Sequence, residues 1–455
     1  MIILNLLEKI KECGNQVILN TFDNAPKYYF YDENNKIIYL ENISDKTLKD
    51  NGIKIKKPSK RKYYSFKRLM EQYPDCQYYI IYGERSNGKS YSILEHLVEE
   101  FYESGYTHAF GYIRRVDEDI KLSNASQVFK SLKCNDNGVN RIEEITKGEY
   151  NDVFVKSRCF YLAHRNEDGE LDKVLDTQPL GYLFALNQSE RIKSTGYPDI
   201  YWIFFEEFIA ENLPLLNEID KLTSVLSTII RNRNNVKIVM AGNTINKHNY
   251  IFKEYGLHKT KYQKPNTVDL YQYRDDMGTL KIACEFTDFP DKSVKKSNIY
   301  FCFNKEKNKM IREGMWQIGN YPHLQYLYKP KDIRFIYFIK YENEIFQCEV
   351  IQTIDNKENK IDNYPNDIYS NKPMLFTYIH KKTSEIKYPH DHIIFQQDYD
   401  SHDNIRTDIM NAYDEVGSFI KSFFATGKVF YQDNEVGDMI DSFLMNTRQR
   451  VGSRI

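Results

Sequence analysis

One stretch constrains this chain more than any other: residues 78–91 read YYIIYGERSNGKSY. The apolar and aromatic run at 78–82 is typical of a buried strand, and residues 93–101 place apolar side chains at helical spacing. Between the two segments, the pattern G-x-x-x-x-G-K-S is formed by Gly83, Gly88, Lys89 and Ser90. This pattern requires a strand that enters a glycine-rich turn and continues into a helix. The sequence supplies that context, so a chance turn of glycine and lysine is the weaker interpretation.

The chemistry of such a turn is phosphate binding. Backbone N–H groups and the positive end of the helix dipole face the phosphates. Lys89 is expected to reach the β- and γ-phosphates, and the Ser90 hydroxyl is expected to bind Mg²⁺. We therefore expect ATP and Mg²⁺ as ligands. The predicted nucleotide-binding loop consists of Gly83, Glu84, Arg85, Ser86, Asn87, Gly88, Lys89, Ser90 and Tyr91.

Two adjacent carboxylates follow a second buried strand. Residues 200–205 form a continuous apolar run that ends at Glu206 and Glu207. A P-loop enzyme needs one carboxylate near the magnesium ion and another group that orients the attacking water. Neighbouring side chains of a strand point in opposite directions, so the pair can divide these roles. We expect Glu206 on the metal side and Glu207 at the water; the alternative is an acidic start to a loop.

Three further polar residues lie at the ends of predicted elements. Asn243 follows the strand predicted at 236–241, where its amide could sense the γ-phosphate; a simple turn residue is the alternative. Arg231 and Arg233 follow a predicted helix at 218–230. An arginine from a neighbouring subunit can neutralise charge in the transition state, although surface arginines usually have no such role. The residues alone leave both interpretations of the arginines open.

Strands alternate with helices through the first half of the chain, which predicts an α/β fold with a mostly parallel sheet covered on both faces. A single strand is expected at 154–163, and a long helix at 405–424 near the end. Four parts are expected. They are an N-terminal extension with a small hairpin at 1–60, an ATPase domain at 61–275, a linker region at 276–325 and a C-terminal domain at 326–455.

Composition narrows the class of protein. The seven cysteines include no C-x-x-C pair, so neither a zinc site nor a disulfide framework is indicated. No apolar run approaches the length of a membrane span, and the N-terminus lacks the order of a signal peptide, so we expect no membrane partner. The formal net charge is −1, so any contact with nucleic acid must come from local basic patches. A histidine- and aspartate-rich segment (His390, Asp391, His392, Asp398, Asp400, His402 and Asp403) matches no metal-binding template.

Several segments together resemble the DNA-packaging ATPases of phi29-like tailed phages. They are YGERSNGKSY at 82–91, YIRR at 112–115, KSTGYPDIYWIFFEE at 193–207 and TIIRNR at 228–233. The resemblance covers about residues 75–255. It implies a P-loop ATPase of the additional-strand, catalytic-glutamate class, acting as a pentameric ring that docks at the portal of a prohead in the host cytoplasm. Such a ring drives double-stranded DNA inward.

The resemblance also implies roles for single residues. By position, Arg231 is similar to the arginine finger that acts on a neighbouring subunit. Lys193 is similar to a family lysine at the subunit interface. Arg233 is expected to support the role of Arg231 or that of Lys193. The family has a lysine that contacts DNA soon after the paired arginines, and this chain has Asp117 there instead. Lys121 is the substitute candidate for that contact.

The C-terminal domain, by the same resemblance, is a reduced, inactive version of an RNase H-like nuclease that binds a packaging RNA and the prohead. Glu342 and Glu344 lie in a hairpin turn at its start, and the basic tail of Arg448, Arg450 and Arg454 would suit RNA phosphates. The alternatives are a complete terminase with an active nuclease, a hexameric helicase, and a nucleotide-gated factor that docks RNA or the prohead.

Overall fold

The structure is a computed structural model of the 455-residue chain. It describes residues 2–14, 16–19, 28–31, 37–40, 43–56, 63–135, 138–193, 195–209, 215, 217–244, 249–276, 278–288, 319–324, 328–352, 375–397, 402, 404–410 and 414–451. The chain divides into two compact units. The first comprises Met1–Ile209, Lys221–Thr244 and Leu257–Met315, and the second comprises Ala210–Asp220, Ile245–Gly256 and Trp316–Ile455.

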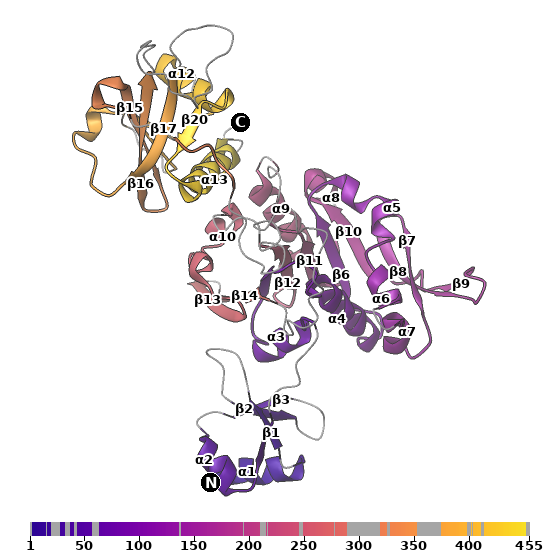
Figure 1. The fold of residues 1–455 in the computed structure, drawn as a ribbon. Helices are drawn as coiled ribbons and strands as arrows, with labels where there is room; N and C mark the ends of the chain where they lie inside the picture. Colours follow the sequence, from indigo (N-terminus) through magenta and orange to yellow (C-terminus); the bar gives the residue numbers. More distant parts are fainter. Residues whose placement is uncertain are drawn as a thin grey trace. The chain divides into compact units, whose positions relative to one another are not determined.

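The first unit begins with a small sheet of its own, with strand order β3-β2-β1-β4 (Figure 1). The expected hairpin is present, because β2 (Tyr28–Tyr31) pairs antiparallel with β3 (Ile37–Leu40). The central strand β1 (Gln16–Leu19) also pairs in parallel with β4 (Lys54–Lys56), a strand that periodicity did not predict. Helices α1 (Ile2–Glu12) and α2 (Asp45–Asp50) contribute to the same small core.

A ten-stranded sheet dominates the first unit, with the order β13-β14-β5-β12-β11-β6-β10-β8-β7 and β9 paired to β8. Six of these strands, β14 through β10, run parallel, which confirms the expected α/β fold with a mainly parallel sheet. Strand β12 separates the loop-bearing strand β5 from the carboxylate-bearing strand β11. This additional strand is the feature that defines the predicted ATPase class.

The elements of this sheet have the following bounds. The strands are β5 (Tyr78–Gly83), β6 (Ala109–Arg114), β7 (Asp152–Lys156), β8 (Cys159–Arg165), β9 (Leu171–Val174), β10 (Gly181–Ala185), β11 (Ile200–Glu206), β12 (Lys237–Asn243), β13 (Thr267–Asp275) and β14 (Gly278–Thr287). The helices are α3 (Phe66–Gln72), α4 (Lys89–Glu103), α5 (Leu122–Ala125), α6 (Lys130–Lys133), α7 (Arg141–Ile145), α8 (Ser189–Ile192) and α9 (Glu218–Ile230).

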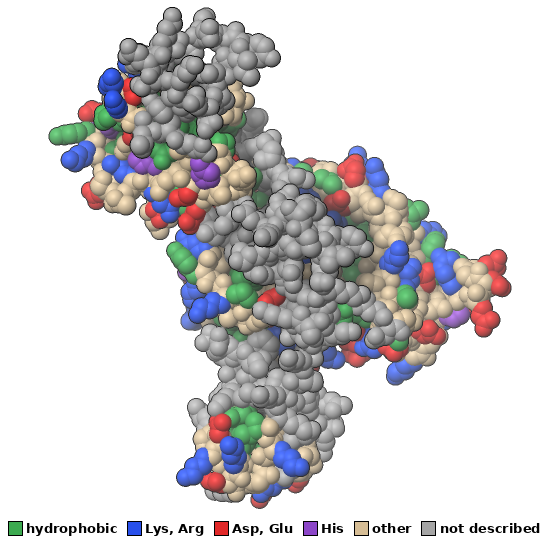
Figure 2. Space-filling model, in the orientation of Figure 1, with side chains coloured by type: hydrophobic (Ala, Val, Ile, Leu, Met, Phe, Trp, Pro, Cys, Tyr) green, Lys and Arg blue, Asp and Glu red, His purple; other side chains and the backbone are tan. Residues whose placement is uncertain are grey.

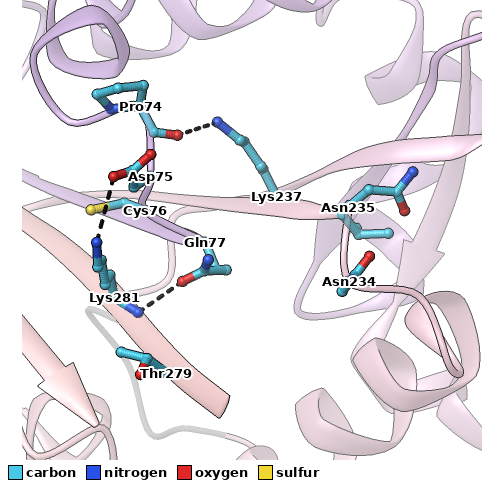
Figure 3. Close-up of a pocket in the computed structure, with 10 residues that line it drawn as sticks. Pro74, Asp75, Cys76, Gln77, Asn234, Asn235, Lys237, Thr279 and Lys281 are labelled. Carbon is cyan, nitrogen blue, oxygen red and sulfur yellow. Dashed lines mark hydrogen bonds and ion pairs between the residues drawn. The ribbon is translucent and has the colours of Figure 1, made fainter. Parts of the chain in front are cut away.

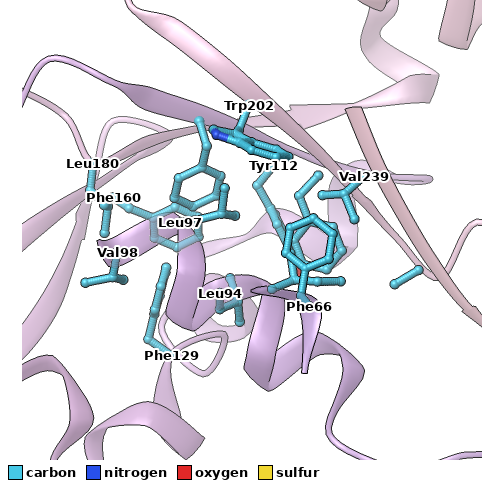
Figure 4. Close-up of a cluster of buried hydrophobic side chains, with 14 of the residues drawn as sticks. Phe66, Leu94, Leu97, Val98, Tyr112, Phe129, Phe160, Leu180, Trp202 and Val239 are labelled. Carbon is cyan, nitrogen blue, oxygen red and sulfur yellow. The ribbon is translucent and has the colours of Figure 1, made fainter. Parts of the chain in front are cut away.

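A continuous apolar cluster joins the sheet to the helices before and after β5 (Figure 4). Phe66 of α3 and Leu94 and Leu97 of α4 supply the helix side, and Tyr112 and Trp202 belong to the sheet side. Phe66 lies edge-on to Trp202 with ring centroids 5.8 Å apart, a favoured geometry for aromatic pairs. The core thus holds the start of α4, and with it the phosphate-binding turn, against the sheet.

Two expectations about this sheet were wrong. The single strand expected at 154–163 is two strands, β7 and β8, because Ser157 and Arg158 adopt positive φ angles of 53° and 60° and turn the chain back. The expected linker began at residue 276, but β14 occupies Gly278–Thr287 and pairs with β5 along its length. Residues 289–318 of that linker lie outside the described residues.

The second unit contains a mixed six-stranded sheet with the order β19-β18-β15-β16-β17-β20. The expected hairpin is present as β15 (Ile333–Tyr341) and β16 (Glu344–Gln352), followed by β17 (Leu375–Lys382), β18 (Ile394–Gln396), β19 (Ile405–Arg406) and β20 (Val429–Tyr431). Strands β15, β16 and β17 form an antiparallel series, and β18 lies parallel beside β15.

Among the described residues, the helices that lie wholly within the second unit are α10 (Tyr250–Glu254), α12 (Glu415–Ala425) and α13 (Asn434–Val451). The long helix expected at 405–424 was wrong in its first half, where β19 and Asp414 precede α12. The Asp414 carboxylate accepts a hydrogen bond from the Gly417 N–H and so begins the helix. Of the helices in the described residues, none is long and apolar enough to cross a membrane.

Candidate nucleotide site

The turn between β5 and α4 has the backbone of a phosphate-binding loop. Gly83 has a φ of 151° and Gly88 a φ of 93°, and Ser86 lies between them at 61°. A Cβ atom at Gly83 would lie 1.8 Å from the carbonyl oxygen of Thr287, so β14 leaves room only for glycine. Gly88 immediately precedes Lys89, the first residue of α4, which points the helix N-terminus at the turn.

Lys89 is folded back into this turn. Its amine donates to the Glu84 carbonyl oxygen at 2.6 Å and to the Asn87 side-chain oxygen at 3.2 Å, and it lies 3.5 Å from the Asn243 Oδ1 atom. The side chain is buried, and desolvation lowers the pKa of Lys89 to about 7. An anion placed at the turn would restore the charged form of this amine. The buried Asn87 side-chain nitrogen also lacks a hydrogen-bond partner among the described residues. The loop therefore fits a phosphate group.

Asn243 reaches this site from the next strand. β12 pairs in parallel with β5, and the register places Asn243 opposite Gly83. The Thr244 N–H donates to the Gly83 carbonyl oxygen at 3.1 Å, so the end of β12 is fixed to the start of the loop. The structure brings Lys89 and Asn243 together, and the γ-phosphate role of Asn243 stays a prediction.

The paired carboxylates lie at the same edge of the sheet as Asn243, at the end of β11, the strand next to β12. Glu206 ends β11, and Glu207 follows with a positive φ of 57°, a strained conformation for a residue with a side chain. Arg115 donates to the carbonyl oxygens of Glu207 and Phe208 at 2.9 Å each and holds this backbone in place. The Glu206 side chain is 17% exposed and the Glu207 side chain 59%, so the two carboxylates meet different surroundings.

Arg114 bridges the two carboxylates, and sequence reasoning missed this role. Its guanidinium lies 3.2 Å from Glu206, 2.6 Å from Glu207 and 3.6 Å from Asp119. Tyr112 donates a hydrogen bond to Glu206 as well. Burial alone would lower the pKa of Arg114, but Tyr112 and the two carboxylates raise it. The signal that could have revealed Arg114 was its place at the end of a strand parallel to β11.

Arg233 lies at the opposite edge of the sheet, where β11 begins, and Arg231 and Lys193 have their partners outside the P-loop turn. Arg231 follows the C-terminus of α9, and its guanidinium donates to the Thr195 carbonyl oxygen at 3.1 Å. Lys193 is exposed and pairs with Glu190 at 2.6 Å. All five N–H groups of Arg233 are used by backbone carbonyls of its own chain. The structure therefore does not bring these three residues to the P-loop of the same subunit.

A pocket of about 360 Å³ also lies at this opposite edge, where β5, β12 and β14 begin (Figure 3). Lys237 donates to the Pro74 carbonyl oxygen at 2.8 Å, and Lys281 lies 3.5 Å from Asp75. Both amines are thus engaged by protein groups. The pocket is separate from the phosphate-binding turn and contains none of the predicted catalytic residues.

Other sequence candidates do not form a site among the described residues, where no group of three or more His, Cys, Asp or Glu side chains could hold a metal ion. Asp398, Asp400 and Asp403 lie outside the described residues. Arg454 and the side chains of Arg448 and Arg450 do so as well.

The two residues that bear on the expected DNA contact, Asp117 and Lys121, each lie close to a side chain of opposite charge. Asp117 pairs with Arg158 at 2.7 Å, and Lys121 is exposed and lies 3.6 Å from Glu118.

Comparison with known proteins supplies a family. A family profile described as "Podovirus DNA encapsidation protein (Gp16)" matches residues 58–372. The DNA packaging protein of Bacillus phage B103 is 28% identical over 182 residues, which cover 39% of this chain and 47% of the relative. That of Bacillus phage phi29 is 27% identical over 194 residues, covering 42% of this chain and 49% of the relative. The chain thus spans about half the length of the curated relatives it matches.

Solved structures of similar proteins include a packaging motor and the N-terminal domain of a packaging ATPase. The phi-28 gp11 DNA packaging motor aligns over 85% of this chain and 98% of its own, with 16% identity and a TM-score of 0.44. The N-terminal domain of the DNA packaging ATPase from bacteriophage phi29 aligns over 49% of this chain and 95% of its own, with 24% identity and a TM-score of 0.36.

Proposed function

Because the chain belongs to the family of podovirus DNA encapsidation proteins, we propose that it is an ATP-hydrolysing subunit of a motor that moves double-stranded viral DNA into a prohead. The observation that carries this proposal is the convergence of three groups at one edge of the parallel sheet. They are the Lys89 turn after β5, Asn243 at the end of β12, and the Glu206–Glu207 pair at the end of β11.

These groups can divide the work of ATP hydrolysis. Lys89 and the backbone N–H groups of the turn bind and orient the phosphates. Ser90 and Glu206 would hold Mg²⁺, which neutralises charge on the phosphate oxygens when bound. Glu207, at the more exposed end of the pair, would orient water for in-line attack. Asn243 would sense the γ-phosphate through its contact with the same turn.

The position of Arg231 supports action on a neighbouring subunit. Arg231 precedes β12 and Asn243 ends it, and a seven-residue strand spans roughly 20 Å at about 3.3 Å per residue. A subunit therefore cannot place its own Arg231 at its own Lys89 turn. In a closed ring, the Arg231 edge of one subunit would face the nucleotide edge of the next, with Lys193 beside that interface. We propose a homo-oligomeric ring, and a pentamer as its size.

DNA, the prohead portal and a packaging RNA are the proposed partners of this ring. The formal net charge is −1, and acidic and basic side chains are interspersed on the face in Figure 2, so any grip on the DNA backbone has to come from a small number of local basic side chains.

The C-terminal unit is proposed to be an RNase H-like domain that has lost its nuclease. Its sheet has the antiparallel series β15-β16-β17 with β18 beside β15, and β15 contains no acidic residue. Glu349 on β16 is engaged by Tyr328, Gln347 and His380, so this carboxylate is committed within the domain.

ATP hydrolysis by the wild type and by Glu207→Gln, each with and without duplex DNA, tests the function. We expect DNA-stimulated turnover in the wild type, and in the variant retained ATP binding with a rate lower by a factor on the order of 10² or more. Equal rates in the two proteins would refute the role of Glu207 and favour a docking factor with negligible turnover. Metal-dependent cleavage of the duplex would instead favour a complete terminase.

A further inference from the structure

Arg233 makes an unusual set of contacts. Its Nη1 atom donates to Pro198 at 2.8 Å and Ile200 at 2.7 Å, its Nη2 atom to Tyr197 at 3.0 Å and Ile229 at 2.7 Å, and its Nε atom to Ile230 at 3.4 Å, in every case to the backbone carbonyl oxygen. A guanidinium has five N–H donors, and all five are used here. Burial lowers the pKa of Arg233, although nearby Tyr201 and Asp199 act in the opposite direction. The contacts are those of a clamp between two backbone segments.

One side of this clamp is the C-terminus of α9. Ile229 and Ile230 are its last residues, and the carbonyl groups of a last helical turn have no partner within the helix. The other side is the segment 197–200 that leads into β11. Tyr197 packs edge-on against Phe184 of β10 with ring centroids 5.0 Å apart, so this segment is also fixed to the sheet. Arg233 therefore ties α9 to a loop that is anchored elsewhere.

The same loop seats Arg231. Arg231 has a positive φ of 49°, which turns its side chain out of the helical path, and its Nη2 atom donates to Thr195 at 3.1 Å. The guanidinium also lies against Gly196, since a Cβ there would be 3.5 Å from Nη1. The seat of Arg231 and the grip of Arg233 are thus consecutive parts of one loop, residues 195–200.

We propose that Arg233 is a positioning residue that sets the place of Arg231 for action on the neighbouring subunit. This inference rests on the proposed function, in which Arg231 completes the nucleotide site of the next subunit. A lysine could not replace Arg233, because an ammonium group has three donors and no planar fork. Without the clamp, the loop and the α9 terminus move independently, and Arg231 loses its seat.

The first test is steady-state ATP hydrolysis by the DNA-stimulated, assembled motor containing Arg233→Lys. We expect kcat to fall roughly 10- to 100-fold because a displacement of about 1 Å has that effect, while KM for ATP stays near the wild-type value. Arg274→Lys, a substitution on the exposed part of β13, is the matched control and should leave both constants unchanged. In an Arg231→Ala background, Arg233→Lys should add no further loss, since it acts through Arg231.

Mixed rings give the second test. Lys89→Ala subunits cannot use their own nucleotide site but carry an intact Arg231, so mixing them with Arg233→Lys subunits should raise the rate per active site. If Arg233→Lys does not fold, Gly196→Val places a branched side chain against the Arg231 guanidinium without removing any donor of Arg233; we expect it to disturb the seat of Arg231 and to show the same rescue.

The possible failures are distinct. Wild-type kcat in Arg233→Lys or in folded Gly196→Val, with a large loss in Arg231→Ala, overturns the positioning role alone. Further loss in the double variant, or no rescue in mixed rings, also overturns it. An unaffected Arg231→Ala overturns the proposed trans action itself.

Discussion

The Nη2 atom of Arg114 lies 2.6 Å from the Oε2 atom of Glu207, the carboxylate proposed to orient water. Arg114 contacts Glu206 and Asp119 with its other nitrogens, so one guanidinium joins three carboxylates. Asp119 belongs to the short helical turn Asp117–Ile120, which follows β6 at the catalytic edge of the sheet. If Glu207 has the proposed role, it must leave this ion pair before it can act on water, so we interpret this conformation as a resting one.

Replacing Arg114 with glutamine should raise the ATPase rate in the absence of DNA and reduce its stimulation by DNA. The Glu207 side chain is more than half exposed, so its ion pair contributes at most about 1 kcal/mol, and release should raise the basal rate no more than about fivefold. Rates with and without duplex measure the effect. Arg158→Gln, which removes the exposed pair with Asp117, is the control. A basal rate below that of the wild type would contradict the resting-state interpretation.

The nucleotide-free protein should become more stable as pH rises, because of Lys89. The pKa of this amine is lowered to about 7 in the folded state, and the usual value near 10.5 applies in the unfolded state. Between these values the unfolded state binds more protons, so the free energy of unfolding increases with pH and the cost of the buried charge is greatest below pH 7. Lys89→Met should therefore stabilise the nucleotide-free protein at pH 6, and this advantage should shrink by pH 9.5.

Chemical unfolding followed by the fluorescence of buried Trp202, which reports on the sheet, measures this difference. Lys130→Met, at an exposed position of α6, is the matched control and should show no such trend. A stabilisation by Lys89→Met that is the same at both pH values would refute the assignment to the buried amine.

Alanine at Gly83 should disrupt the loop rather than merely weaken it. The new Cβ would meet the backbone of Thr287 at 1.8 Å, and φ at this position is 151°. β14 must move away from β5, at an expected cost of about 2 kcal/mol or more in stability. Thermal unfolding and ATP binding should both be impaired. Gly169→Ala is a useful comparison, because its φ of 80° also strains alanine but no atom lies within 4 Å of the new Cβ. Equal effects of the two changes would show that the contact with β14 is unimportant.

The predicted fold of the ATPase unit was correct because its signals are local. The buried run of β5, the glycines of the turn and the apolar stripe of α4 all lie within 25 consecutive residues, and each reports its own structure. Glu206 and Asn243 could be placed near the turn because parallel strands end at a common edge. The roles assigned to these residues remain predictions.

The missed features depend on contacts between distant residues. β14 was read as part of a linker because the chain turns polar from Phe286 to Lys296, but Glu285 and Thr287 of β14 are buried in the structure. The local sequence pattern does not indicate that Glu285 forms an ion pair with Arg68, which lies more than two hundred positions earlier in the chain. Arg233 was expected at a nucleotide because the sequence shows only the positive charge of its side chain. Several of the backbone carbonyl groups that surround this side chain in the structure come from distant residues and could not be inferred from the sequence.

Breaking the buried ion pair between Arg68 of α3 and Glu285 of β14 should destabilise the ATPase unit strongly. The side chains are 13% and 2% exposed, and Glu285 also accepts a hydrogen bond from Tyr64 at 2.8 Å. Arg68→Met leaves the carboxylate buried without its cation, so we expect a loss of ~3–5 kcal/mol. The double variant Arg68→Met, Glu285→Met removes both charges and should recover much of this stability. Denaturant unfolding of the three proteins measures the coupling, and a double variant less stable than Arg68→Met would mean that the pair does not act as a unit. Because the Tyr64 N–H donates to the Asn87 carbonyl oxygen at 2.9 Å, the weakened variant should also bind ATP less tightly.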